Sequence, residues 1–178
     1  MASRYLVLLL GVAVATIAFN GYAADSQETW VFSSIYGNER TLSRYAEGSY
    51  SVSVADVTVV MEACDEDLYR VCFASRSLSV AIPREPPRKD STWTVGPATY
   101  SVLSIVERTK LLGNDVSDLY VINVHRAAVP PLDIVAHRFR LFFSYSDGLL
   151  AFGELGETGE VPYLYFAPRI PSLGATDR

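Results

Sequence analysis

The sequence predicts a mainly β domain, built as an antiparallel sandwich or a partly open barrel. Apolar and polar residues alternate with the two-residue period of strands over many short segments. Turn residues separate these segments, and no long stretch carries a clean helical stripe. We therefore expect about nine short strands and at most one or two short helices, with an α+β arrangement as the alternative.

Four strands are expected in the first half of the chain. The alternation slips by one residue at Ala55-Asp56, which is the pattern that a β-bulge leaves. Residues 38–47 form the one weak helical stretch, because charged and apolar side chains mix there without a clear strand period. The four expected strands are residues 29–35, 50–54, 57–62 and 73–82.

The second half begins with a proline-rich loop, residues 84–90, whose two prolines favour extended backbone. A long hairpin is expected to turn near Gly113. Another should turn at Ser146-Asp147-Gly148, where Asp-Gly between two apolar runs favours a type I′ turn. Pro162 near the start of the last strand favours an edge position. The expected strands are residues 93–95, 99–108, 119–124, 138–145, 149–152 and 161–167.

The N-terminus has the pattern of a secretory signal peptide. Arg4 precedes an uncharged run of about fifteen residues, and small residues occupy Gly21 and Ala23. The run is shorter than the roughly twenty residues that span a bilayer, although an uncleaved anchor is the alternative. We expect a signal peptide at residues 1–23, one β-rich domain at 24–170 and a loose tail at 171–178. The protein is then periplasmic or extracellular, with no stable membrane insertion after cleavage.

Two cysteines follow the expected signal peptide, and export exposes them to an oxidising compartment. A hairpin that turns near Leu68 would place Cys64 and Cys72 opposite each other. Facing residues of an antiparallel pair lie about 4.5–5.5 Å apart at Cα, within disulfide reach. The sequence therefore predicts a structural disulfide, with two buried thiols as the alternative.

Charge argues against nucleic acid as a partner. The full chain has a net charge of −5, and loss of Arg4 with residues 1–23 leaves 14 Lys and Arg against 20 Asp and Glu, a net charge of −6. Nucleic-acid binding demands a basic surface, so an acidic domain of this size is poorly suited to it.

Candidate catalytic groups are few. His125 and His137 are the only histidines, and each lies at the end of an expected strand rather than in a metal-ligand motif. No serine has the glycine-flanked setting of a nucleophile elbow, and no glycine loop of phosphate-binding type is present. Glu154, Glu157 and Glu160 are spaced among glycines and are expected to form a solvated turn. No metal and no cofactor are predicted.

Two surfaces are candidates for binding. Tyr163 and Tyr165 share one face of the last expected strand by the two-residue period. Tyrosines on an edge strand would form an amphipathic stripe of the kind that interfaces favour. Arg84, Arg88 and Lys89 lie on the proline-rich loop and form a basic projection on an acidic protein.

These features predict an exported, non-enzymatic protein that binds a protein partner as an inhibitor, an immunity factor or an envelope accessory. One alternative is a small envelope hydrolase that uses carboxylates or His137. The other alternative is a carrier that holds a small apolar ligand inside the β domain.

Overall fold

The computed structural model describes residues 28–45, 50–54, 57–64, 68–74, 78–111, 113–128, 137–167 and 173–174. The described chain folds as twelve antiparallel strands and contains no helix, which confirms the predicted fold class with more strands than the nine expected. The strands are β1 (Glu28–Ser34), β2 (Glu39–Arg44), β3 (Tyr50–Val54), β4 (Val57–Ala63), β5 (Tyr69–Ala74), β6 (Ser79–Pro83), β7 (Thr92–Val95), β8 (Ala98–Leu111), β9 (Asn114–Arg126), β10 (His137–Ser144), β11 (Gly148–Glu154) and β12 (Tyr163–Phe166).

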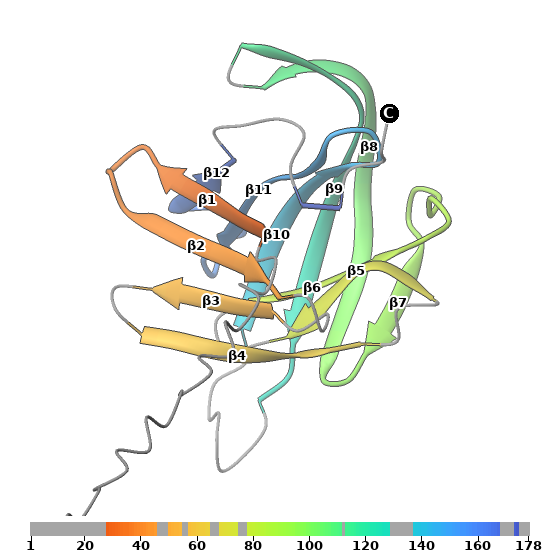
Figure 1. The fold of residues 1–178 in the computed structure, drawn as a ribbon. Coiled ribbons are helices and arrows are strands. Elements are labelled where there is room, and N and C mark those ends of the chain that lie inside the picture. Colours follow the sequence, from red (N-terminus) through yellow and green to blue (C-terminus); the bar gives the residue numbers. More distant parts are fainter. Residues whose placement is uncertain are drawn as a thin grey trace, which may run out of the picture.

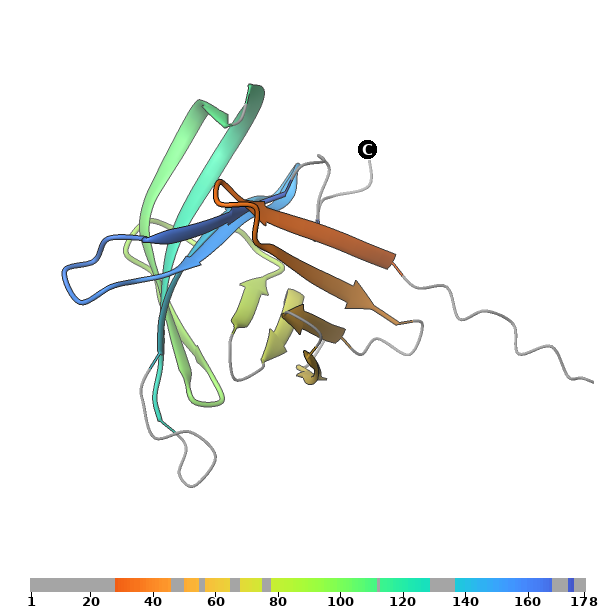
Figure 2. The same ribbon diagram turned by 90° about the vertical axis from the view of Figure 1, so that its left-hand side faces the viewer.

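The strands hydrogen-bond in the order β6-β5-β4-β3-β2-β1-β12-β11-β10-β9-β8-β7. Each strand therefore pairs with its neighbours in the chain, except that β1 pairs with β12 and the ladder is open between β6 and β7. The two halves, β1–β6 and β7–β12, fold toward each other around one core (Figures 1 and 2). This open arrangement is consistent with a β-sandwich.

Alternation along the strands builds the core. In β9, Tyr120, Ile122 and Val124 are buried, while His125 of the same strand is exposed. Both halves of the ladder contribute, and the largest fully buried side chains include Phe32 of β1 and Phe139 of β10. Burial of such side chains provides the main favourable free energy of the fold.

Three expectations in the first half are wrong. The expected strand at residues 73–82 is two strands, because β5 ends at Ala74 and β6 begins at Ser79, and the two pair with Phe73 facing Val80. Residues 39–44 form β2 rather than part of a helix, because Leu42 enters the core while its neighbours Thr41 and Ser43 lie on the other face. The phase slip does not mark a bulge within one strand. It separates β3 from β4, which pair in opposite directions with Val54 facing Val57, and residues 55–56 themselves lie outside the described residues.

The β10–β11 connection also differs from its predicted type I′ turn. A type I′ turn needs a positive φ at both central residues. Gly148 has a φ of +86°, but Asp147 does not have a positive φ, so this turn is not of type I′. The buried Asp147 carboxylate instead accepts hydrogen bonds from the hydroxyls of Ser144 (3.3 Å) and Ser146 (2.9 Å). Three residues separate β10 from β11, a length typical of a turn that ends in a left-handed glycine.

The expected loose tail contains a docked segment. Leu173 is only 2% exposed, and its carbonyl oxygen accepts a 2.8 Å hydrogen bond from the Leu149 N–H. Gly174 accepts a second hydrogen bond from Arg70 Nε of β5. These two residues are therefore held against the domain, whereas residues 171–172 and 175–178 lie outside the described residues.

Candidate functional site

Two exposed tyrosines meet at one end of the sheet, and the exposed Ile35 is next to one of them in the chain. Ile35 and Tyr36 occupy the turn between β1 and β2 and are 79% and 66% exposed. Tyr163, the first residue of β12, is 50% exposed. The rings of Tyr36 and Tyr163 meet edge to face with their centroids 5.8 Å apart. We call Ile35, Tyr36 and Tyr163 the aromatic rim.

Strand register explains why the two tyrosines meet. β1 and β12 are antiparallel, and Ser34 faces Tyr165. If this register is continued two residues beyond Ser34 and two residues back from Tyr165, Tyr36 lies opposite Tyr163. The ring contact therefore extends the β1–β12 ladder beyond its last backbone pair.

The turn itself keeps its apolar side chains at the surface. The Ser34 hydroxyl accepts hydrogen bonds from the backbone N–H groups of Tyr36 (3.3 Å) and Asn38 (3.2 Å). Gly37 has a φ of +79°, a left-handed conformation that glycine adopts without a steric cost. The local backbone thus fixes Ile35 and Tyr36 outside the core.

Tyr165 shares the strand face of Tyr163, as the two-residue period predicts, but its surroundings differ. It is 9% exposed and stacks on Phe152 with ring centroids 5.5 Å apart. The guanidinium of Arg40 lies over the Tyr165 ring, 4.8 Å from its centroid. The expected edge position is wrong because β12 lies between β1 and β11. Of the two predicted tyrosines, Tyr163 alone is well exposed.

Arg40 adds a positive charge beside the aromatic rim. Tyr163 and Tyr165 are two residues apart on one strand, so roughly 7 Å separates their backbone positions. Arg40 covers Tyr165, and its Nε is buried without a hydrogen-bond partner among the described residues.

Scattered exposed apolar residues are normal on a protein surface, whereas a contiguous cluster is informative. Tyrosine offers an apolar ring for burial and a hydroxyl for hydrogen bonding, which explains its enrichment at interfaces. The aromatic rim combines two such rings with Ile35 and a neighbouring cation, Arg40. This combination can bury apolar area and accept a polar or acidic group from a partner.

The predicted basic loop lies elsewhere. Arg84, Arg88 and Lys89 are exposed on the connection between β6 and β7. Arg84 lines a small cleft together with Arg44, at the end of β2 opposite to Arg40. The structure therefore does not bring the basic loop and the aromatic rim together.

The predicted disulfide is present. Cys64 and Cys72 are joined with an S–S distance of 2.06 Å and a Cα–Cα distance of 5.2 Å. β4 and β5 are antiparallel with Ala63 facing Phe73, so the next position in register pairs the two cysteines symmetrically about Leu68. The bond links two adjacent strands, and such bonds are typical of proteins from oxidising compartments.

The candidate catalytic groups do not converge. Arg126 of β9 faces His137, and His125 faces Arg138, so the two histidines lie on opposite faces of the β9–β10 pair. The predicted glutamate cluster, Glu154 with residues 157 and 160, is exposed. Within the described part of the chain, no group of three or more His, Cys, Asp and Glu residues is placed to hold a metal ion.

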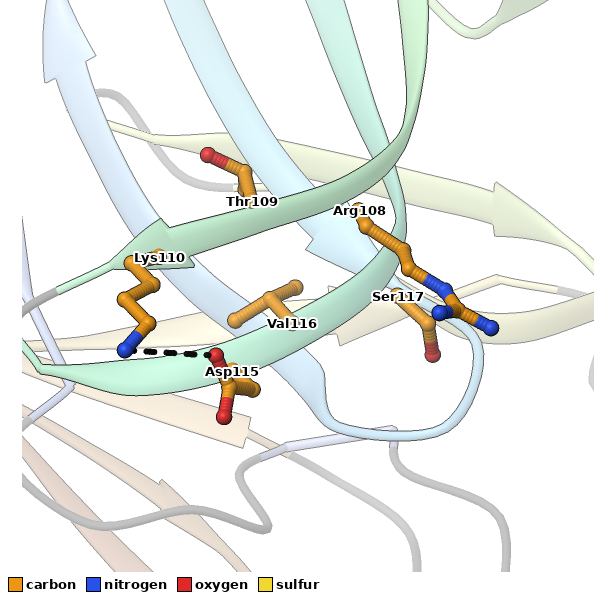
Figure 3. A pocket seen from close by; sticks show the side chains of 6 residues that line it. All are labelled: Arg108, Thr109, Lys110, Asp115, Val116 and Ser117. Atoms are coloured by element: carbon orange, nitrogen blue, oxygen red, sulfur yellow. Dashed lines mark ion pairs between the residues drawn. The ribbon is translucent and has the colours of Figure 1, made fainter.

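A larger hollow of about 620 Å³ lies on the long β8–β9 hairpin, which extends past its neighbouring strands (Figure 2). Lys110 and Asp115 point toward each other across it and form a 3.8 Å ion pair (Figure 3). Both side chains are well exposed, and such pairs typically contribute about 0–1 kcal/mol. The lining residues that the structure describes all belong to these two strands: Arg108, Thr109, Lys110, Asp115, Val116 and Ser117.

Comparisons with known proteins give no indication of function, so the geometry is the basis for the functional proposal. No family model, curated protein or solved structure matches this chain. No helix in the described residues has the length and apolar composition needed to cross a membrane.

Proposed function

We propose that this chain is an exported, non-enzymatic protein that binds another protein through the aromatic rim, as an inhibitor, an immunity factor or an envelope accessory. The exposed contact between Tyr36 and Tyr163 carries this proposal. Binding energy at protein interfaces is concentrated in a few residues, and tyrosine and arginine are enriched among them. Here two exposed tyrosines lie near Arg40, whose guanidinium lies over the ring of Tyr165, two residues from Tyr163 on the same strand.

Export is supported by two features. Residues 1–23 have the charged, apolar and small-residue pattern of a signal peptide. The Cys64–Cys72 disulfide fits an oxidising compartment such as the periplasm or the extracellular space.

The two alternative functions receive less support from the geometry. A carrier needs interior space for its ligand, but the core between the two halves is filled by large side chains such as Phe73, Phe143 and Leu149. A hydrolase needs an acid or a second base close to its histidine. His125 and His137 lie on opposite faces, which prevents them from acting as a pair.

Site-specific crosslinking tests the binding proposal. A photoreactive phenylalanine analogue replaces Tyr36, Tyr163 or Leu103 in cells that produce the protein. Leu103 is a matched control because it is an exposed apolar residue, at 47%, on β8 rather than on the rim. We expect a discrete protein adduct from positions 36 and 163 and none from position 103.

The adduct's partner, once purified, allows affinity measurements. Truncation of an interface hot spot costs about 2 kcal/mol or more, so Tyr36→Ala and Tyr163→Ala should each weaken binding by roughly thirtyfold. Leu103→Ala should leave the affinity unchanged. Equal adducts from all three positions, or unchanged affinity of both tyrosine variants, would refute the proposal. A hydrolytic activity that disappears in His137→Ala would favour the hydrolase instead.

A further inference from the structure

Three arginines surround a small polar cleft at the end of the β1–β6 half that is opposite to Arg40. Arg44 ends β2, Arg70 lies in β5, and Arg84 directly follows β6. The cleft has a volume of about 60 Å³, which holds a few water molecules or the oxygens of one small anion. We call it the arginine cleft. Among the residues that the structure describes, its lining consists of Arg44, Tyr50, Tyr69, Arg70, Cys72 and Arg84.

Surrounding contacts hold two of these guanidinium groups in place. Arg70 Nε donates a hydrogen bond to the Gly174 carbonyl oxygen, and its guanidinium lies 5.8 Å from the ring centroid of Tyr145. The guanidinium of Arg44 lies 6.0 Å from the ring centroid of Tyr50. Aromatic faces attract cations, so these rings favour fixed positions for the charges. Less side-chain entropy is then lost when an anion binds.

Clustering of positive charge at this point runs against the average charge of the protein. The chain has 20 acidic and 15 basic residues, yet three cations line this one cleft. Arg44 and Arg84 have further interaction partners of their own. Each guanidinium nevertheless carries five N–H donors in a planar fork, so one partner leaves donors for another.

We propose that the arginine cleft binds a phosphate group as a dianion. Guanidinium forks match the geometry of phosphate oxygens and form charge-assisted hydrogen bonds with them. Three guanidinium groups can donate hydrogen bonds to several oxygens of one tetrahedral phosphate. A carboxylate has only two oxygens and requires fewer donors. The small volume admits the phosphate itself while any attached molecule stays outside. The phosphate can come from a free ion, from a soluble ester or from a lipid headgroup.

Calorimetric titration of the full exported protein with inorganic phosphate, in a low-salt buffer free of other oxyanions, tests this proposal. Arg44→Gln and Arg84→Gln each remove one exposed cation from the cleft. Arg88→Gln is the matched control because it removes an exposed arginine from the same loop outside the cleft. Loss of one charge-assisted contact should weaken binding about tenfold or more, whereas the control should change it less than about threefold. Thermal melting checks that each variant remains folded.

Two further ligands distinguish the sources of the phosphate. Glycerol 3-phosphate represents a soluble ester, and vesicles of phosphatidic acid in phosphatidylcholine represent a lipid headgroup. Binding to any of the three that depends on Arg44 and Arg84 supports the proposal and identifies the source. Absence of saturable binding to all three, or equal weakening by Arg88→Gln, would overturn it, because the second result indicates general charge attraction only.

Discussion

Nε1 of Trp93 donates a 3.0 Å hydrogen bond to the backbone oxygen of Ala81. Trp93 belongs to β7 and Ala81 to β6, the two edge strands between which the ladder is open. The Trp93 ring also stacks on Tyr100 at 5.4 Å, which places the indole over the core. One side chain therefore connects the edges where backbone pairing stops, and it satisfies a carbonyl on an otherwise unpaired edge.

Trp93→Phe should lower the free energy of unfolding by more than the smaller ring alone explains. Phenylalanine can still stack on Tyr100 but cannot donate to Ala81, whose buried carbonyl would lose its partner at a cost of about 1–3 kcal/mol. Trp30→Phe is the control because Trp30 is also partly buried against the core and makes no indole hydrogen bond in the described structure. Urea unfolding measures both variants. Equal losses of unfolding free energy in the two variants would show that the Trp93 hydrogen bond adds no stability.

The disulfide should contribute measurably to stability. It closes a short loop with a sequence separation of 8, for which the chain-entropy model gives about 2–3 kcal/mol. Replacing Cys64 and Cys72 together with alanine should lower the melting temperature by about 5–10 °C. A reductant should lower the melting temperature of the wild type and leave the double variant unchanged. Alkylation of both cysteines in native, unreduced protein would contradict the bond.

Export predicts a defined processing site. The small residues Gly21 and Ala23 predict signal cleavage between Ala23 and Ala24. The intact mass of protein recovered outside the cytoplasm should therefore lack residues 1–23. Full-length protein retained in the membrane would instead support an uncleaved anchor.

Local patterns in the sequence located most of the strands and the cysteine pair. β2 was missed because the inward side of this strand carries Arg40 and Arg44 on either side of Leu42, so its alternation is not apolar against polar. Both guanidinium groups lie over aromatic rings, those of Tyr165 and Tyr50, and these contacts stabilise charged side chains on the same side of the strand as Leu42. Such stabilisation depends on tertiary contacts and leaves no local signal.

The candidate site was predictable only in part. Tyr163 follows from the period of the last strand, but its partner Tyr36 is far away in the chain and reaches it through the β1–β12 pairing. No local pattern specifies that long-range pairing. A usable signal did exist, because Tyr36 precedes Gly37-Asn38, a pair of turn-forming residues that favours a surface position.

Alkaline pH should destabilise the protein through the buried Tyr100 and the partly buried Tyr145. Burial raises the pKa of Tyr100 and Tyr145 above the ordinary value of 10.0, and the neighbouring hydroxyls of Tyr69 and Tyr120 add to the respective shifts. The unfolded chain loses these protons near pH 10, while the folded protein retains them to higher pH. Stability from this source is thus complete below pH 10 and declines as the pH rises above it. Absorbance at the tyrosinate band and urea unfolding across this range should show delayed ionisation and falling stability.

The docked C-terminal segment allows a test of whether residues 173–174 belong to the fold. Leu173 is buried, so Leu173→Ala should destabilise the protein by about 2–5 kcal/mol if the segment stays docked in solution. Gly174 has a φ of +79°, and an added Cβ would meet the side chains of Val71 and Phe143. Gly174→Ala should therefore weaken docking for both conformational and steric reasons.

The Gly174 carbonyl also holds Arg70, so Gly174→Ala should release that guanidinium from one of its fixed contacts. Amide hydrogen exchange at Leu149, whose N–H donates to Leu173, reports the docking directly and should accelerate in both variants. Leu103→Ala, an exposed leucine on β8, is the control and should change stability by no more than about 0.5 kcal/mol. Unchanged exchange at Leu149 and unchanged stability in both tail variants would mean that the segment is loose, as the sequence predicted.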